Sequence, residues 1–359
     1  MTERERNAIR ALSEANAPSG FEDETVRAAR DVIGNACSVT EDFLRNLYLY
    51  RRRNTGDRPV LMLDAHSDEV GFMVHSIRPN GTLRAVPLGG WNRATLPGAR
   101  VRVRNKSGRW IPGVIAAKPP HFMRAAEKEH AGAPEIRDLA IDVGAKSAGQ
   151  AETEFGIRIG EPVVPDTPFC FDEEHRLLHG KAFDCRLGCA ALLEVMRRIA
   201  DEDLSVDVVG VLSAQEEVGE RGAKVSVSRV RPDAALVFEG CPADDTFGEE
   251  YAVQTRLGGG PMIRFMDVSV ISNPRFVRYA LDLAEAEGIP AQAAVREGGG
   301  NDAAVIQSTL CGAPAIVLGV PVRYIHTPAC IASADDYEAT VALALKLIRS
   351  LNESVIQSF

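Results

Sequence analysis

The sequence predicts an α/β fold, in which helices cover a mostly parallel sheet and a small β-barrel domain is inserted into the chain. Apolar runs before residue 72 and after residue 166 are typical of buried parallel strands, and helical patterns alternate with them. Between these parts, short alternating runs separated by glycine-containing turns indicate an all-β unit. We therefore expect one α/β domain made of residues 1–71 and 167–359, interrupted by a barrel domain of residues 72–166.

The N-terminal part predicts two helices and one strand. A helical pattern opens the chain, and a second follows in FEDETVRAARDVIGNA, with acidic residues in its first turn and Gly34 near its end. The apolar run in RPVLMLDAHSDEVGFMV is typical of a buried parallel strand, which we expect to end near His66.

The middle part predicts the barrel. The runs GFMVHSIRPNGTLRAVPLGG, ARVRVRNKSGRWIPGVIAA and LAIDVGA are β-like, and Asn-Gly, Lys-Ser-Gly and Pro-Gly turns punctuate them. The segment PPHFMRAAEKEHAGAPE, residues 119–135, interrupts this pattern and predicts a polar loop.

The C-terminal part returns to alternating strands and helices. The amphipathic stretch CRLGCAALLEVMRRIA predicts a helix, and two further helices are expected at residues 272–288 and 339–353. Strands are expected at residues 205–213, 233–240 and 313–320, so the sheet should be covered on both faces.

Composition narrows the classes of protein that fit. The chain has 359 residues, 45% of them hydrophobic, which is enough for about two domains. A net charge of −9 argues against nucleic acids and anionic membranes as partners. Seven scattered cysteines without a CxxC pair indicate free thiols in a reducing compartment. Without an apolar leader or a run of about 18 apolar residues, we expect a cytoplasmic protein that spans no membrane.

Residues able to bind metal ions recur where the predicted strands end. The carboxyl ends of strands in an open parallel sheet converge on one crevice, where ligands bind, so residues far apart in the sequence can meet there. One further acidic residue stands just before the predicted helix in GKAFDCRLG. The candidates are His66, Asp68, Asp184, Glu216, Glu217, Glu239 and His326.

Two histidines and three carboxylates suit a pair of divalent ions. Asp184, Glu217 and Glu239, together with His66 and His326, could hold two zinc ions with one carboxylate shared between them, and these ligands also accept cobalt or manganese. Two such ions carry four positive charges against three negative ones, so a hydroxide would complete the balance and act as the nucleophile of a hydrolase.

The adjacent glutamates of SAQEEVG suggest a division of roles. Neighbouring residues of an extended segment point to opposite sides, so we assign Glu217 to a metal ion and Glu216 to proton transfer as general base. His66 and Asp68 are two residues apart and share a face, which would let Asp68 accept the other ring N–H of His66.

Each signal alone leaves a structural alternative open. Asp184 could cap the following helix, Glu239 could be a turn residue, and His326 could be a loop histidine. GGGNDA, residues 298–303, fits the dinucleotide pattern GxGxxA, but no suitable acidic strand end follows it. We interpret it instead as a tight loop whose backbone amides could meet a substrate carbonyl.

The order of these motifs resembles a known family. APSGFE, HSDEVGFMV, PLGGW, IDVGAKS, GKAFDCRLG, QEEVGERGA, FEG, LGGGP, GGGNDAA and VRYIHTP are similar to the dinuclear-zinc metallo-aminopeptidases that assemble as tetrahedral particles. Members of this family are also called glutamyl aminopeptidases or endoglucanases. The resemblance implies a zinc-peptidase α/β domain with an inserted β domain, and a dodecameric particle.

The resemblance also implies ligand sets. His66, Asp184 and Glu239 would hold one metal ion. Asp184, Glu217 and His326 would hold the other. Glu216 would be the general base, with Asp68 behind His66, in agreement with the assignment from spacing.

Three positions depart from the family pattern. Glu239 stands where several members carry Asp, so Asp244 or Asp245 could compete as the ligand. Cys185 stands where a second acidic or amide residue is common; we expect a packed thiol there, although it could touch a metal ion, and a cis peptide bond after Asp184. Asn301 stands where Thr is usual, which affects the expected substrate contacts.

The sequence therefore predicts an aminopeptidase that uses two metal ions to release residues from the free N-termini of short peptides. The free amine would be recognised near the metal ions by carboxylates such as Glu239. A carboxypeptidase or N-deacylase on the same scaffold stays open. A particle-forming binding protein that has lost activity is the third hypothesis, against which all the expected ligands being present argues.

Overall fold

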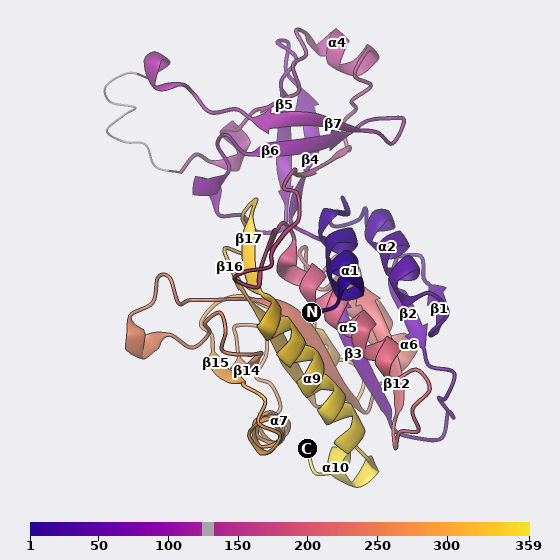
Figure 1. Ribbon diagram of the computed structural model, residues 1–359. Helices are drawn as coiled ribbons and strands as arrows, with labels where there is room; N and C mark the ends of the chain where they lie inside the picture. The colour runs from indigo at the N-terminus through magenta and orange to yellow at the C-terminus, as the bar shows by residue number, and fades with distance from the viewer. Residues whose placement is uncertain (124–132) are drawn as a thin grey trace.

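A central sheet of eleven strands forms the larger part of the protein, and a closed barrel of six strands projects from one end of it (Figure 1). The computed structural model describes residues 1–123 and 133–359. The main path of the sheet runs β1-β2-β12-β3-β13-β16-β17-β11-β10, and β14 pairs with β16 and β15 off this path. The predicted α/β fold with an inserted barrel is confirmed.

The elements have the following bounds. The helices are α1 Glu3–Glu14, α2 Asp23–Ile33, α4 Ala148–Thr153, α5 Phe183–Arg198, α6 Arg221–Val230, α7 Pro274–Ala286, α8 Ala303–Ser308, α9 Ala334–Ser350 and α10 Glu353–Gln357. The strands of the sheet are β1 Ser38–Glu41, β2 Leu47–Tyr50, β3 Val60–His66, β10 Cys170–Asp172, β11 Leu177–Gly180, β12 Asp207–Ser213, β13 Ala234–Pro242, β14 Met262–Met266, β15 Gln292–Val295, β16 Ala315–Arg323 and β17 Cys330–Ser333. The strands of the barrel are β4 Gly71–Ile77, β5 Leu83–Leu88, β6 Arg100–Arg104, β7 Trp110–Ile115, β8 Ile141–Asp142 and β9 Pro162–Pro165.

The four central strands β12, β3, β13 and β16 are mutually parallel. Every residue of β12 is buried, as a strand covered on both faces requires, which explains its continuous apolar run. The register of β12 and β3 pairs Ser213 with His66, so both strands end at the same level of the sheet. Towards its two edges the sheet becomes antiparallel, at β2 and β1 on one side and at β17, β11 and β10 on the other.

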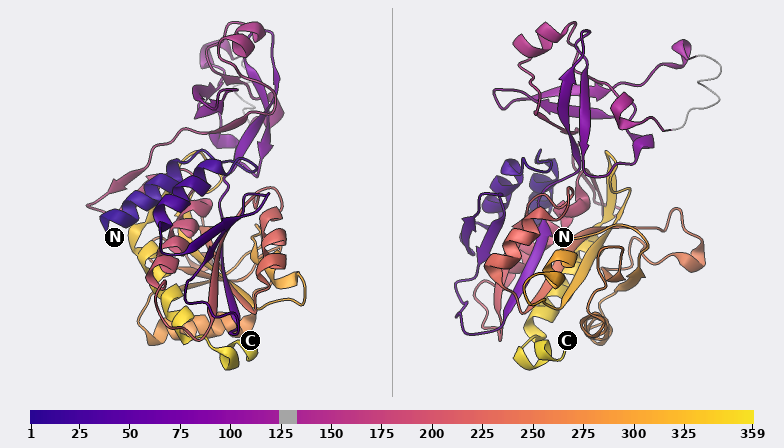
Figure 2. Two further views of the ribbon diagram at one scale, coloured as in Figure 1. Left: turned by 90° about the vertical axis from the view of Figure 1, so that its right-hand side faces the viewer. Right: turned by 180° about the vertical axis from the view of Figure 1, so that it is seen from behind.

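Helices cover both faces of the sheet, as the two further views show (Figure 2). Because side chains alternate along a strand, Leu61 and Leu63 of β3 join the core cluster beneath α1, α2, α5, α7 and α9. Met62 between them packs in a separate cluster with Val227 of α6 and Ile306 of α8 on the opposite face.

The barrel follows β3 after a connection of four residues. β4 and β5 pair antiparallel around the predicted Asn80-Gly81 turn, and Gly81 has a φ of 86°, which a glycine adopts without strain. Phe72, Val101 and Val163 belong to the barrel's own hydrophobic core. The division of the chain into domains at residues 71/72 and 166/167 stays a prediction, and residues 124–132 of the predicted polar loop lie outside the described residues.

Two features differ in extent from the expectation. α9 begins at Ala334 rather than near residue 339, because the Ser333 hydroxyl accepts the N–H of Asp335 and caps the helix, with two acidic residues in its first turn. The sheet strands β1, β2, β10, β11, β14, β15 and β17 were not predicted, nor were the helices α4, α6, α8 and α10. Among the residues that the structure describes, no helix combines the length and apolarity that crossing a membrane requires.

Candidate active site

The carboxyl ends of the central strands open onto a cavity of about 260 Å³. His66 ends β3, Glu239 lies within β13 rather than in a turn, and His326 follows β16 by three residues. The barrel reaches this cavity through Gly90, which lies in the loop after β5. Six of the seven predicted site residues line the cavity, namely His66, Asp184, Glu216, Glu217, Glu239 and His326.

The carboxylate of Asp184 lies between the two histidines. Its Oδ1 is 2.9 Å from Nε2 of His66, and its Oδ2 is 3.4 Å from Nε2 of His326. Asp184 stands at the start of α5 with a ψ of 106°, outside the helical range, so its side chain projects from the turn towards the strand ends. The two oxygens of one carboxylate therefore face two different imidazoles.

The glutamates surround this pair of histidines. Oε2 of Glu239 is 3.7 Å from Nε2 of His66, and Oε2 of Glu216 is 3.9 Å from the same nitrogen. Oε2 of Glu217 is 3.5 Å from Nε2 of His326. The nearest histidine nitrogen therefore differs between the two adjacent glutamates, although ligand atoms of His66, Glu216 and Glu217 also lie within 4.8 Å of one another. The roles assigned to Glu216 and Glu217 stay predictions.

The reason given for this separation was wrong, because the segment is not extended. After β12 the chain turns at Gln215, which has a φ of 58°, and the N–H groups of Gly219 and Glu220 bond to the carbonyl of Glu216. A tight turn, not strand alternation, sends the carboxylates of Glu216 and Glu217 to different sides.

Asp68 is buried behind the cavity and contacts three parts of the site. Its Oδ1 is 3.4 Å from Nδ1 of His66 and accepts the backbone N–H of Glu216 at 3.0 Å. Its Oδ2 accepts the backbone N–H of Glu217 at 3.3 Å and the hydroxyl of Ser19 at 2.6 Å. Asp68 thus connects the orientation of His66 to the turn that carries both glutamates.

Burial dominates the electrostatics of the glutamates. It raises the pKa of Glu216 to about 7 and the pKa values of Glu217 and Glu239 well above 4.5, because ionised carboxylates lose hydration there. Burial acts in the same direction on Asp184, but contacts with His326 and His66 outweigh it and hold the pKa of Asp184 below 3.8. Burial lowers the pKa of His326, yet Asp184 and Glu217 reverse that effect and raise it to about 9.

The donor set fits divalent metal ions. Around a tetrahedral zinc ion bound at about 2.0–2.3 Å, ligand atoms lie roughly 3.3–3.7 Å apart. The four imidazole–carboxylate distances that involve Asp184, Glu217 and Glu239 range from 2.9 to 3.7 Å. Oε1 of Glu217 is buried without a hydrogen-bond partner among the described residues, so it offers a free ligand atom. Asp184, Glu217 and His326 form one group of ligand atoms within 4.8 Å of one another.

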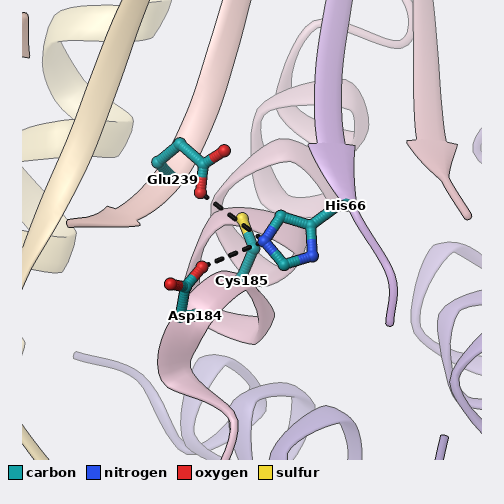
Figure 3. A group of neighbouring side chains, drawn as sticks. All are labelled: His66, Asp184, Cys185 and Glu239. Atoms are coloured by element: carbon teal, nitrogen blue, oxygen red, sulfur yellow. Dashed lines mark hydrogen bonds and ion pairs between the residues drawn. The ribbon is translucent and has the colours of Figure 1, made fainter. Parts of the chain in front are cut away.

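A second such group consists of His66, Asp184, Cys185 and Glu239 (Figure 3). The sulfur of Cys185 lies near the imidazole of His66 and the carboxylate of Glu239, and the Asp184–Cys185 peptide bond is cis, as predicted. Cys185 is completely buried and its Sγ donates to the carbonyl of Phe238 at 3.1 Å.

The structure gives other partners to the alternative residues. Asp244 bonds to the guanidinium of Arg296 at 2.6 Å, and Asp245 pairs with Arg323 at 2.6 Å, so neither belongs to a ligand group of the described residues. Asn301 is buried and donates to Asp267 at 2.7 Å, outside the lining of the cavity.

Two arginines and a glycine loop complete the lining and were not all anticipated. Arg264 of β14 and Arg296 after β15 both line the cavity and were missed, because no local pattern marks them as site residues. Gly298, Gly299 and Gly300 of the GGGNDA motif also line the cavity, as the loop interpretation requires.

Comparisons with known proteins match this architecture over nearly the whole chain. A family model of the M42 glutamyl aminopeptidases matches residues 46–343. The glutamyl aminopeptidase of Lactococcus lactis subsp. cremoris (strain MG1363) is 35% identical over 347 residues, which cover 96% of each chain.

Solved structures give the same result. The TET aminopeptidase from a marine sediment archaeon, Thaumarchaeota archaeon, is 36% identical and has a TM-score of 0.94, with 99% of both chains covered. The TET1 peptidase of Pyrococcus horikoshii, which can assemble into a tetrahedron or a large octahedral shell, is 27% identical with a TM-score of 0.86, covering 97% of this chain and 100% of its own. The chain therefore belongs to the M42 glutamyl aminopeptidase family and is a peptide hydrolase.

Proposed function

We propose that the chain is a metal-dependent aminopeptidase that releases residues from the free N-termini of short peptides. The observation that carries this proposal is the carboxylate of Asp184, whose two oxygens face His66 and His326. A carboxylate placed in this way would be available to two cations at once. Because the chain belongs to an aminopeptidase family, aminopeptidase activity is better supported than carboxypeptidase or deacylase activity.

In this proposal the chain holds two divalent ions. His66, Asp184 and Glu239 would hold one, and Asp184, Glu217 and His326 would hold the other. Zinc suits these nitrogen and oxygen donors best, and cobalt or manganese are accepted by the same ligands. Such ions supply Lewis acidity to the scissile carbonyl and lower the pKa of the attacking water.

Glu216 acts as the general base. Its carboxylate lines the cavity beside His66, while its backbone N–H is held by Asp68. Burial raises the pKa of Glu216 to about 7, close to the pH at which a base can both take and return a proton. Glu216 takes a proton from the attacking water and then passes it to the departing amine of the peptide.

The surroundings orient the substrate. The carboxylates of Glu216 and Glu239 attract the protonated N-terminal amine of a peptide, and the amides of the 298–300 loop are available to its carbonyl oxygen. Gly89 of the barrel approaches Glu217 so closely that a Cβ there would lie 2.9 Å from Oε2 of that glutamate. The barrel therefore borders the cavity and restricts the path of a peptide into it.

We further propose that the protein functions as a homo-oligomer, with a tetrahedral dodecamer as the expected form. The assembly of the Pyrococcus horikoshii TET1 peptidase into a tetrahedron supports this, because the two chains share their fold over nearly their full lengths.

One comparison tests the activity. The protein loaded with zinc or cobalt is given a short peptide with a free amine and its N-acetylated twin. Stepwise release of residues from the free peptide alone is expected. Cleavage of the acetylated twin in preference would overturn the proposal in favour of a carboxypeptidase or deacylase, and inertness towards both with metal bound would favour the binding-protein hypothesis.

A further inference from the structure

Cys185 occupies a position in the site that the proposed zinc ligands do not account for. Its Sγ is one of four potential ligand atoms, with those of His66, Asp184 and Glu239, that all lie within 4.8 Å of one another (Figure 3). Three protein ligands would leave one corner of a tetrahedral ion open, and Sγ of Cys185 is the fourth donor atom of this group.

The fold makes room for this sulfur. A Cβ on Gly188 would come within 2.4 Å of Sγ of Cys185 and 2.9 Å of the carbonyl oxygen of Phe238. Glycine at position 188, one turn along α5, therefore allows the sulfur to lie between the helix and β13. The thiol donates a hydrogen bond to the backbone carbonyl of Phe238 rather than to a side chain.

The other buried thiols of this region are placed differently. Cys189 lies one turn further along α5, and its Sγ donates to the carbonyl of His66 at 3.0 Å. Cys241 follows Glu239 by two residues on β13. Within residues 1–123 and 133–359, neither thiol belongs to a group of three or more metal-binding side chains, so burial near the site alone does not explain the position of Cys185.

We propose that Cys185 is the fourth protein ligand of the ion held by His66, Asp184 and Glu239, so that this half of the site selects thiophilic ions such as zinc and cadmium over manganese. The inference rests on the proposed function, since it requires the metal site. On ligation the S–H bond breaks, a sulfur–metal bond forms, and the proton leaves to solvent. The carbonyl of Phe238 loses its thiol donor in the same step.

Two chemical consequences follow from this ligand. Thiolate is a soft donor that favours zinc and cadmium, whereas manganese prefers carboxylate and carbonyl oxygens. A thiolate would also add a fourth negative charge to those of Asp184, Glu217 and Glu239, and would reduce the Lewis acidity of the ion that it binds.

X-ray absorption of the zinc-loaded full-length protein tests the proposal directly. One sulfur per subunit at about 2.3 Å from zinc is expected in the wild type and in Cys189→Ala, the matched control. The sulfur contribution should disappear in Cys185→Ala. Cobalt loading gives a second readout, because a sulfur-to-cobalt charge-transfer band should appear in the wild type and the control and be absent from Cys185→Ala.

The outcomes separate this inference from the proposed function. Bound zinc with only nitrogen and oxygen neighbours in the wild type would overturn the role of Cys185 and leave the aminopeptidase proposal intact. A sulfur signal that persists in Cys185→Ala would overturn it as well. Failure to bind any metal ion would refute the proposed function and this inference together. A wild-type spectrum without a sulfur neighbour overturns the inference whatever the stability of the variant.

Discussion

The carboxylate of Asp68 accepts the backbone N–H of Glu216 at 3.0 Å, so the residue behind His66 also fixes the position of the proposed general base. The same carboxylate accepts the N–H of Glu217. One buried side chain thus connects the two predicted halves of the site, the histidine from β3 and the glutamates after β12.

Asp68→Asn should reduce kcat/KM by about 10–100-fold, because one carboxylate oxygen is replaced by an amide NH₂ that cannot accept these N–H groups. Steady-state kinetics on a free-amine peptide measures this loss. Ser19→Ala removes only the hydroxyl that donates to Asp68 and should cost much less. Equal losses in the two variants would contradict a role for the contacts of Asp68 with His66 and the glutamates.

Glu216→Gln should reduce kcat by about 10²–10⁴-fold while leaving bound metal unchanged, because it removes the proton acceptor and no proposed ligand. Turnover and metal content of the same preparation are compared. Glu220→Gln is the matched control, since Glu220 stands in the same turn and does not line the cavity. Wild-type turnover by Glu216→Gln with metal bound would exclude the proposed base.

Removal of metal should reverse the pH dependence of stability. Since burial raises the pKa of Glu216 to about 7 and those of Glu217 and Glu239 well above 4.5, the chelated folded chain binds more protons than the unfolded chain above pH 4.5. Its stability therefore falls as the pH rises towards 7 and beyond. Zinc requires ionised carboxylates, so its stabilising effect should grow over the same range.

Thermal unfolding at about pH 5.5 and about pH 7.5, with excess chelator or excess zinc, measures this linkage. The zinc-induced rise in Tm should be larger at the higher pH. An equal rise in Tm at both pH values would mean that the metal ion does not displace protons from the buried glutamates. His66 and His326, whose pKa values are also raised, act in the same direction because they must lose their protons to bind zinc. Groups away from the site contribute equally to both series and cancel in the difference.

Glu69→Gln should destabilise the protein by about 3–5 kcal/mol, because it leaves Lys181 charged and buried without its partner. Glu69 is 1% exposed, and its two carboxylate oxygens accept from Nζ of Lys181 at 2.7 and 2.8 Å. One of these oxygens also accepts the backbone N–H of Ala17 at 3.1 Å and lies 3.5 Å from the guanidinium of Arg186. Urea unfolding in excess chelator gives the free energy without the metal contribution. The exposed pair of Lys346 and Glu287 provides the control, and Glu287→Gln should cost less than about 1 kcal/mol. Similar losses of unfolding free energy in Glu69→Gln and Glu287→Gln would contradict the idea that burial makes the Glu69–Lys181 pair important for stability.

Much of the fold was predictable because burial on both faces leaves a clear pattern. The continuous apolar run before His66 identified β3, and Asn80-Gly81 identified the hairpin of β4 and β5. The candidate residues could be found by the same logic, since the ends of parallel strands share one edge of the sheet.

The turn of the adjacent glutamates could not be predicted in this way. Long-range contacts hold it, because the N–H of Ala214 donates to Asn46 and the N–H of Gln215 donates to Glu22. These partners lie far away in the sequence, so local pattern gives no sign of the left-handed conformation of Gln215.

The two arginines of the cavity lining and Cys185 were not predictable from the apolar pattern either. Arg264 and Arg296 are held by Asp267 and Asp244, and no apolar periodicity marks their positions. The place of Cys185 beside Glu239 follows from the packing of α5 against β13, whereas its residue type alone favoured an ordinary packed thiol.

The carboxylate of Asp184 has a consequence for the synthesis of the protein. It joins His66, from the first fifth of the chain, to His326, from the last tenth. Since a ribosome makes the chain from its N-terminus, the second histidine reaches the site only after residues 67–325 have been synthesised. A nascent chain that ends before His326 therefore lacks one ligand of the proposed metal centre.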